Sequence, residues 1–144
     1  MFVKDIMTKP VVTVDPYDFI HEVKHILENV TFHHILVIEK KKLIGVISDR
    51  DYLKAISPFI STDLERSVDK ASLNRRVHQI MSRKPITVTG KTSMEAAAKL
   101  LLKENISCLP VVTETNEVEG IITWKDILKC FLGIKKKKGV KRET

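Results

Sequence analysis

Apolar positions recur at helical spacing in two stretches of the chain, and two short apolar runs follow each stretch. The helical positions are Ile20, Val23, Ile26, Leu27 and Val30 in the first stretch and Met94, Ala97, Ala98, Leu101 and Leu102 in the second. This spacing predicts two amphipathic helices. Asp18 is the expected N-cap of the first helix, and Thr92 with Glu95 forms a capping box for the second.

The remaining apolar runs predict three strands and a further helix around each of these helices. Strands are expected at 11–14, 35–38 and 43–47, and again at 85–88, 109–112 and 118–122. The further helices are expected over 49–56 and 124–132. The order is therefore β-α-β-β-α twice. Thr62 with Glu65 is a second capping-box pattern, which predicts a linker helix over about 63–71.

The two halves are also related residue by residue. A shift of 74 aligns residues 3–8 (VKDIMT) with 77–82 (VHQIMS), and one insertion near residue 115 moves the shift to 75. We therefore divide the chain into a first repeat (1–56), a partly helical linker (57–76) and a second repeat (77–132). Residues 133–144 form a basic tail that we expect to be disordered.

Neither repeat can cover both faces of its own sheet. Burial of the open apolar face is the expected driving force for pairing of the repeats. The predicted fold class is α+β with α/β-type layers, in which two β-α-β-β-α repeats pack sheet to sheet about a pseudo-twofold axis. Such packing would create two equivalent clefts.

One strand-to-helix corner occurs in both repeats and carries the candidate chemistry. Residues 45–51 (GVISDRD) and 120–126 (GIITWKD) share a glycine, a hydroxyl residue and an aspartate at the same spacing. The hydroxyl can cap the helix, and the aspartate then lies in the first turn beside unsatisfied N–H groups. This combination suits a polyol such as ribose. A capped helix start alone would explain one copy, whereas two copies favour a binding site.

Composition and charge exclude several classes of protein. The 144 residues are 43% hydrophobic and 30% charged, which is ordinary for a soluble globular chain. No apolar run approaches the length of a membrane span, so we expect a cytoplasmic protein with no membrane partner. Five of the seven net positive charges lie in the tail, where no aromatic side chains alternate with them. Nucleic-acid binding is therefore not expected.

The sequence contains none of the catalytic motifs that we considered. G-x-G-x-x-G and H-E-x-x-H are absent, and Gly90-Lys91-Thr92 lacks the earlier glycine that a phosphate-binding loop needs. No cluster of cysteine and histidine residues has metal-ligand spacing, and the helical pair His21 and His25 lacks further ligands beyond Glu22. We therefore expect no enzyme activity, no catalytic residues, no metal site and no required cofactor.

Taken together, these features make the sequence resemble a tandem pair of cystathionine-β-synthase (CBS) domains, or Bateman module. The resemblance covers residues 3–132 and depends on both corner motifs, on 5–8 with 79–82, and on 34–37 with 108–111. Residues 48–58 are also similar to bacterial acetoin-utilisation accessory proteins. The resemblance implies a regulatory module that binds AMP, ADP, ATP, S-adenosylmethionine or NAD in its clefts. It would signal to an unknown protein partner or through a homodimer.

The resemblance further implies a role for individual residues. The expected ligand residues are Asp51, Asp126, Ser48 and Thr123 for ribose, His33, His34, Arg50 and Lys125 for phosphate, and Val12 and Ile86 for adenine. Arg50 and Lys125 could instead be solvated helix residues, and the two histidines could simply begin a strand. Two other functions stay open. One is a ligand-free dimerisation scaffold with Phe131 and Leu132 at the seam, and the other is a nucleic-acid-associated accessory protein that uses the tail.

Overall fold

The computed structural model describes residues 1–9, 11–29, 34–60 and 62–134, which fall into two compact units. The unit that we call the α2 unit comprises Val12–Lys40 and Ile44–Lys84. The other, the α5 unit, comprises Met1–Val11, Lys41–Leu43 and the chain from Pro85 onward. Residues 135–144 lie outside the described part, so the predicted disorder of the tail stays a prediction.

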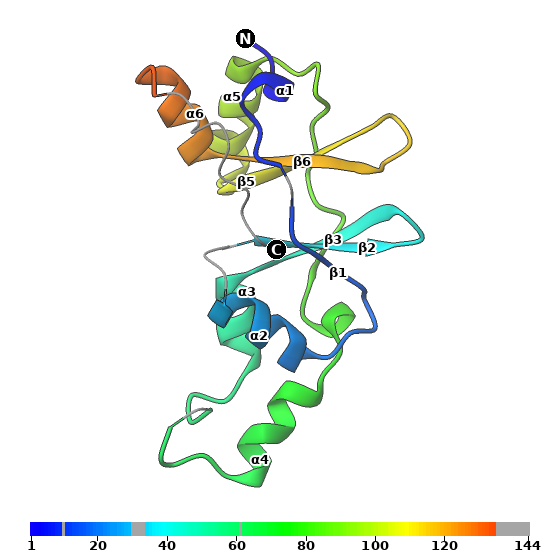
Figure 1. The fold of residues 1–144 in the computed structure, drawn as a ribbon, viewed down its shortest axis with the longest axis vertical. Helices are drawn as coiled ribbons and strands as arrows, with labels where there is room; N and C mark the ends of the chain where they lie inside the picture. Colours follow the sequence, from blue (N-terminus) through cyan, green and yellow to red (C-terminus); the bar gives the residue numbers. More distant parts are fainter. Residues whose placement is uncertain (10, 30–33, 61, 135–144) are drawn as a thin grey trace. The chain divides into compact units, whose positions relative to one another are not determined.

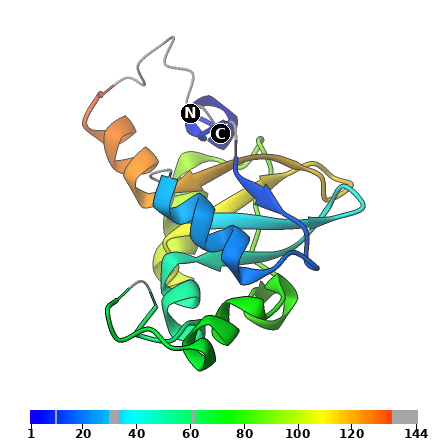
Figure 2. The same ribbon diagram turned by 60° about the horizontal axis from the view of Figure 1, so that its bottom comes forward.

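The α2 unit contains a four-stranded sheet flanked by two helices. Its strands, in spatial order, are β1 (Thr13–Val14), β2 (His34–Glu39), β3 (Lys42–Ser48) and β4 (Ser82–Arg83). β1 is parallel to β2, and β4 is antiparallel to β3. Helices α2 (Ile20–Asn29) and α3 (Asp49–Ala55) lie on one face of the sheet (Figures 1 and 2). The core of this unit includes the fully buried Ile20, Val23, Ile35, Val37, Ile47 and Val77.

The α5 unit is built on one antiparallel pair of strands. These are β5 (Cys108–Val112) and β6 (Val118–Thr123). Helices α1 (Val3–Ile6), α5 (Met94–Glu104) and α6 (Trp124–Phe131) lie on one side of the pair (Figure 1). The core of this unit includes the fully buried Val3, Ala97, Leu109, Val111 and Ile122. The mixed α+β class is confirmed, and the predicted order of elements is found in both repeats except for the first strand of the second repeat. Packing of the repeats sheet to sheet stays a prediction.

Each unit includes the opening segment of the other repeat. In the α5 unit, Val3 N donates to Thr92 O at 2.8 Å, which ties the N-terminus to the second repeat. In the α2 unit, Val77 N donates to Asp18 O at 2.8 Å, and strand β4 pairs with β3. Boundaries drawn at residues 56 and 77 therefore follow the duplication and not the grouping of the chain in space.

This exchange of segments explains the glycine in each corner motif. A Cβ atom on Gly45 would lie 2.5 Å from Met81 Sδ, and one on Gly120 would lie 2.9 Å from Met7 Sδ. Both distances are too short for non-bonded carbon and sulfur, so only glycine leaves room for the methionine. In each unit the methionine of one repeat therefore packs against the corner glycine of the other repeat.

The second helix of each repeat is confirmed, but the predicted caps of the first helices are wrong. Helix α5 is capped by Ser93, whose hydroxyl accepts from Ala96 N at 3.1 Å. Thr92 and Asp18 close the turns that come before the helices. The Asp18 carboxylate accepts from Asp15 N at 2.9 Å, and α2 begins two residues later. Polar residues cluster ahead of both helices, so the pattern alone does not select the cap.

The predicted strand at 85–88 is reduced to a single parallel bridge at Val88. In the first repeat the matching ladder includes a bond from Leu36 N to Val12 O at 3.0 Å. The residue equivalent to Leu36 is Pro110, which has no N–H to donate. The ladder therefore cannot extend to Ile86, and the predicted strand is wrong for this reason.

The linker helix begins later than predicted. Helix α4 spans Ser67–Lys70 and continues into a 3-10 turn, η1 (Ala71–Asn74). Thr62 caps no helix: its hydroxyl donates to Phe59 O at 2.6 Å and accepts from Leu64 N at 3.3 Å in a turn that ends before α4 begins. A second 3-10 turn, η2 (Val77–Gln79), leads into β4. No helix in the described ranges is both long and apolar enough to cross a membrane.

Asp69 holds the linker together. It is 5% exposed, and Ser57 Oγ donates to its Oδ1 at 2.7 Å. Arg66 N donates to Oδ2 at 2.8 Å. The hydrogen bond from Ser57, followed by that from the Arg66 backbone, lowers the pKa of Asp69 from its usual value of 3.8. The carboxylate is therefore stabilised in its charged form, and it fixes the chain just ahead of Arg75.

Candidate functional site

Both corners form capping boxes, as the sequence predicts. In the α2 unit, Ser48 N donates to Asp51 Oδ2 at 3.0 Å, and Asp51 N donates to Ser48 Oγ at 3.1 Å. In the α5 unit, Thr123 N donates to Asp126 Oδ2 at 2.9 Å, and Asp126 N donates to Thr123 Oγ1 at 3.3 Å. The start of each helix therefore fixes the position of its aspartate.

The aspartate of the α5 unit already has protein partners for both carboxylate oxygens. Thr8 Oγ1 donates to Asp126 Oδ1 at 3.0 Å, and Thr123 Oγ1 donates to Oδ2 at 3.2 Å. Asp126 is only 8% exposed. Beside this corner, Cys130 Sγ lies 3.1 Å from Met1 Sδ. A ligand hydroxyl would have to displace Thr8 before it could bind this carboxylate.

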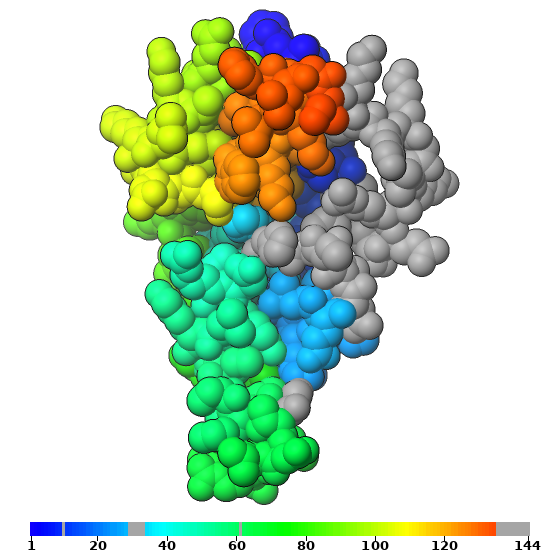
Figure 3. Space-filling view, turned by 90° about the vertical axis from the view of Figure 1, so that its left-hand side faces the viewer, coloured from blue at the N-terminus to red at the C-terminus, as the bar shows by residue number. Residues whose placement is uncertain are grey.

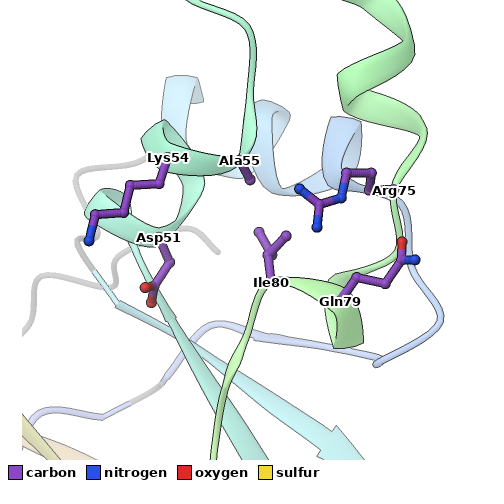
Figure 4. A pocket seen from close by; sticks show the side chains of 6 residues that line it. All are labelled: Asp51, Lys54, Ala55, Arg75, Gln79 and Ile80. Atoms are coloured by element: carbon purple, nitrogen blue, oxygen red, sulfur yellow. The ribbon is translucent and has the colours of Figure 1, made fainter.

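The aspartate of the α2 unit borders a cavity instead. The cavity has a volume of about 200 Å³ (Figure 4). Its lining residues are Asp51, Lys54, Ala55, Arg75, Gln79 and Ile80. Figure 4 shows that Asp51 and Lys54 come from α3, and that Arg75 reaches over Ile80 from the opposite side. All six residues belong to the α2 unit.

The cavity combines one carboxylate, two cations and a small apolar surface. Within the described ranges, Asp51 Oδ1 has no hydrogen-bond partner, and the side chains of Lys54 and Arg75 form no ion pair. Gln79 uses Oε1 to accept from Arg76 N at 2.8 Å, so its NH₂ group remains as a donor. This arrangement can accept hydrogen bonds from a diol and can attract an anion.

The structure brings only some of the predicted ligand residues to this cavity. Asp51 lines it and Ser48 supports Asp51, while Thr123 and Asp126 lie in the closed corner. The predicted phosphate residues are elsewhere: Arg50 and Lys125 are exposed and do not line the cavity, His34 begins β2, and His33 is outside the described residues. Their predicted roles stay predictions.

The predicted adenine contacts also differ between the units. Val12 is half-buried against the core of the α2 unit, whereas Ile86 is 36% exposed. No group of three or more histidine, cysteine, aspartate or glutamate side chains suited to a metal ion occurs in the described part of the chain. The contribution of Val12 and Ile86 to binding stays a prediction.

Five of the lining residues are not singled out by the sequence. Lys54 has a local signal, since it lies three residues after Asp51 on the same helical face. Arg75, Gln79 and Ile80 lie beyond the first repeat, and only the exchange of segments brings them to α3. The repeated spacing of glycine and methionine is the signal that could have revealed this exchange.

The fold and its two matched corners define the class of protein. The family model of the CBS domain matches residues 3–58 and 77–133, so the chain belongs to the CBS domain family. The CBS domain pair of protein MJ0100, solved with 5′-methylthioadenosine and S-adenosyl-L-methionine, is 31% identical with a TM-score of 0.76. That alignment covers 94% of this chain and 98% of the solved CBS domain pair. The predicted resemblance to a CBS pair is confirmed.

Other relatives extend the comparison. CBSX2, solved with AMP, is 28% identical with a TM-score of 0.76, over 94% of this chain and 98% of that one. Uncharacterized protein MJ1225 of Methanocaldococcus jannaschii is 28% identical over 130 residues, 90% of this chain, and the chain spans 46% of its length. AcuB from Vibrio cholerae, an acetoin-utilisation protein, is 24% identical with a TM-score of 0.75. The alignment covers 93% of this chain and 92% of AcuB. At that identity the likeness to AcuB concerns the fold.

Proposed function

We propose that this chain is a regulatory module that binds an adenosyl compound at the Asp51 cavity. One observation carries the proposal: a carboxylate fixed by a helix cap presents a hydrogen-bond acceptor beside an open cavity. The presence of 5′-methylthioadenosine, S-adenosyl-L-methionine and AMP in structures of related CBS proteins supports this ligand class.

The binding step follows from the chemistry of the corner. The ribose hydroxyls donate to Asp51, which the Ser48 backbone holds in place. Hydrogen bonds to a charged group contribute about 1.5–3 kcal/mol each. A cavity of about 200 Å³ is smaller than the roughly 300–1,000 Å³ typical of whole-ligand sites. It therefore holds the sugar and its 5′ substituent, and adenine extends beyond it.

Regulation requires that the ligand bind one state of the protein better than another. The cavity is lined by α3 and by Arg75, Gln79 and Ile80, which come from the end of the linker and the start of the second repeat, so a ligand that contacts both sides favours the state in which they are close. At a ligand concentration of about 100 times Kd, this preference stabilises the bound state by about 2.7 kcal/mol. A partner protein or a second copy of the chain could then recognise the position that the linker adopts when the ligand is bound.

Calorimetric titration tests the proposal with AMP, ATP, NAD, S-adenosylmethionine and 5′-methylthioadenosine. The variant Asp51→Asn is expected to weaken binding by about tenfold to a hundredfold, because asparagine can keep the helix cap but loses the charge. Asp49→Asn is the matched control, since Asp49 lies in the same helical turn and does not line the cavity. Equal affinities in the wild type and Asp51→Asn would contradict the site.

A ligand-free dimerisation scaffold is the second candidate, and one surface favours it. The outer face of α6, orange to red in Figure 3, carries exposed apolar side chains. They are Trp124, Leu128 and Phe131, followed by Leu132, at 46–79% exposure. This face suits a homodimer seam. If none of the five compounds binds and the chain is dimeric, the scaffold replaces the sensor as the proposed function.

A further inference from the structure

Building on the proposed function, we infer that Arg75 and Lys54 bind a phosphate group, so that the cavity selects adenosine 5′-phosphates over adenosyl compounds without phosphate. The inference comes from two cations that line the cavity and lack ion-pair partners in the described part of the chain. Neither residue is part of the corner motif.

The charge of the cavity does not match an uncharged ligand. Lys54 and Arg75 carry two positive charges against the single negative charge of Asp51. Asp51 is committed to the sugar hydroxyls, which leaves the two cations for the 5′ substituent. A phosphate monoester carries a charge of about −1.5 to −2 near neutral pH and would balance them. The sulfonium group of S-adenosylmethionine is positive at the same end and would be repelled.

The structure holds the backbone of Arg75 but leaves its guanidinium available. Ile20 N donates to Arg75 O at 2.8 Å, which anchors the residue at the start of α2. The side chain then reaches over Ile80 into the cavity (Figure 4). A guanidinium on a fixed backbone can form two parallel hydrogen bonds to phosphate oxygens, whereas Lys54 acts as a point charge. We therefore expect Arg75 to contribute more than Lys54.

The α5 unit lacks this arrangement at the equivalent positions. The duplication places Met1 where the α2 unit has Arg75, and Asp5 where it has Gln79. A guanidinium side chain is thus replaced by a thioether and an amide by a carboxylate. Phosphate recognition by these residues is therefore specific to the α2 unit.

A pair of ligands that differ at the 5′ position tests the inference: AMP and 5′-methylthioadenosine, titrated into the full chain by calorimetry. Wild type is expected to bind AMP at least about tenfold more tightly. Arg75→Gln is expected to remove most of this difference by weakening AMP alone, Arg75→Lys to restore part of it, and Lys54→Gln to have a smaller effect. Lys129→Gln is the matched control, because Lys129 is the equivalent of Lys54 in the other repeat and lines no part of the cavity.

The outcomes separate this inference from the proposed function. Equal affinities for the two ligands, or an Arg75→Gln variant that weakens both alike, would overturn phosphate recognition while leaving adenosyl binding intact. Asp51→Asn is expected to weaken both ligands, since both carry the ribose. If neither ligand binds to wild type, both proposals fail. Selective loss of AMP affinity with rising salt, without loss for 5′-methylthioadenosine, supports the inference.

Discussion

The two strand-to-helix corners are nearly identical in local structure, yet they offer a ligand different things. Each has a glycine packed against a methionine and a hydroxyl that caps the helix through the aspartate N–H. At Asp126 the carboxylate is 8% exposed and accepts the Thr8 hydroxyl. At Asp51 the carboxylate borders a cavity together with Arg75.

The corner motif therefore sets the capping-box geometry of the aspartate, and the segment from the other repeat determines whether the carboxylate is available to a ligand. The segment that reaches the α5 corner brings Thr8, which satisfies the carboxylate. The segment that reaches the α2 corner has Ser82 in place of Thr8, and no hydrogen bond joins Ser82 to Asp51 in the described part of the chain, so this carboxylate stays available beside Arg75 and Gln79. A duplicated motif can therefore hold one ligand site and one structural contact.

The feature that the corners share gives the largest expected effect. Gly45→Ala is expected to lower the free energy of unfolding by about 1–3 kcal/mol, because the new Cβ would press on the methionine and the strand behind it. It would lie 2.5 Å from Met81 Sδ and 3.0 Å from Ser82 O. Gly120→Ala is expected to cost somewhat less, since its nearest approach is 2.9 Å, to Met7 Sδ. Urea unfolding followed by circular dichroism measures both losses.

A double-mutant cycle provides the control for this packing. In a Met81→Ala background the space beside Gly45 is open, so the second change to alanine is expected to cost less. If Gly45→Ala lowers the free energy of unfolding equally in both backgrounds, the glycine is not required by contact with Met81, and the proposed packing of the corners is wrong.

The next effect distinguishes the two aspartates in the absence of ligand. Asp126→Ala is expected to lower the free energy of unfolding by about 2 kcal/mol, because it leaves three part-buried donors of Thr8 and Thr123 without this partner. Asp51→Ala is expected to cost about 1 kcal/mol, as for the loss of an ordinary helix cap. Thr8→Val removes one donor to Asp126 and should fall between wild type and Asp126→Ala. Equal losses for the two aspartates, measured by urea unfolding, would contradict the closed corner.

A smaller effect is expected on the acid dependence of stability through Asp69 in the linker, the segment that contributes Arg75 to the cavity of the α2 unit. The folded-state pKa of Asp69 is lowered by Ser57 and by the Arg66 backbone. Its contribution to stability is therefore complete above the usual value of 3.8 and is lost as the pH falls through the lower folded value. Asp69→Asn should flatten this acid dependence, with Asp63→Asn, which is exposed, as control. Unfolding free energies between about pH 2 and 6 measure the slope, and identical slopes in wild type and Asp69→Asn would contradict the assignment.

Much of the fold follows from local sequence pattern. The helices at 49–55 and 124–131 begin at the predicted hydroxyl caps, because the capping box is complete in four consecutive residues. The strand expected at 85–88 fails for a reason that lies elsewhere in the sequence. Pro110 belongs to the neighbouring strand, and its missing N–H has an effect only once the two segments pair.

The site is predictable to a smaller degree. The motif identifies Asp51 and Ser48, whose roles depend on contacts within one turn of helix. It cannot identify Arg75, because that residue reaches α3 through a long-range exchange of segments. Nor can it distinguish Asp51 from Asp126, since both exchanged segments carry a hydroxyl residue, Thr8 and its equivalent Ser82, and only the folded structure shows that Thr8 donates to Asp126.

An AMP titration followed residue by residue in two-dimensional amide NMR spectra distinguishes the Asp51 site from the Asp126 corner. Saturation is expected at one AMP per chain. The amide signals that shift should be those of Asp51, Lys54, Ala55, Arg75, Gln79 and Ile80, while those of Thr8, Thr123 and Asp126 stay in place. Shifts centred on the α5 corner, or equal shifts at both corners, would contradict the Asp51 site.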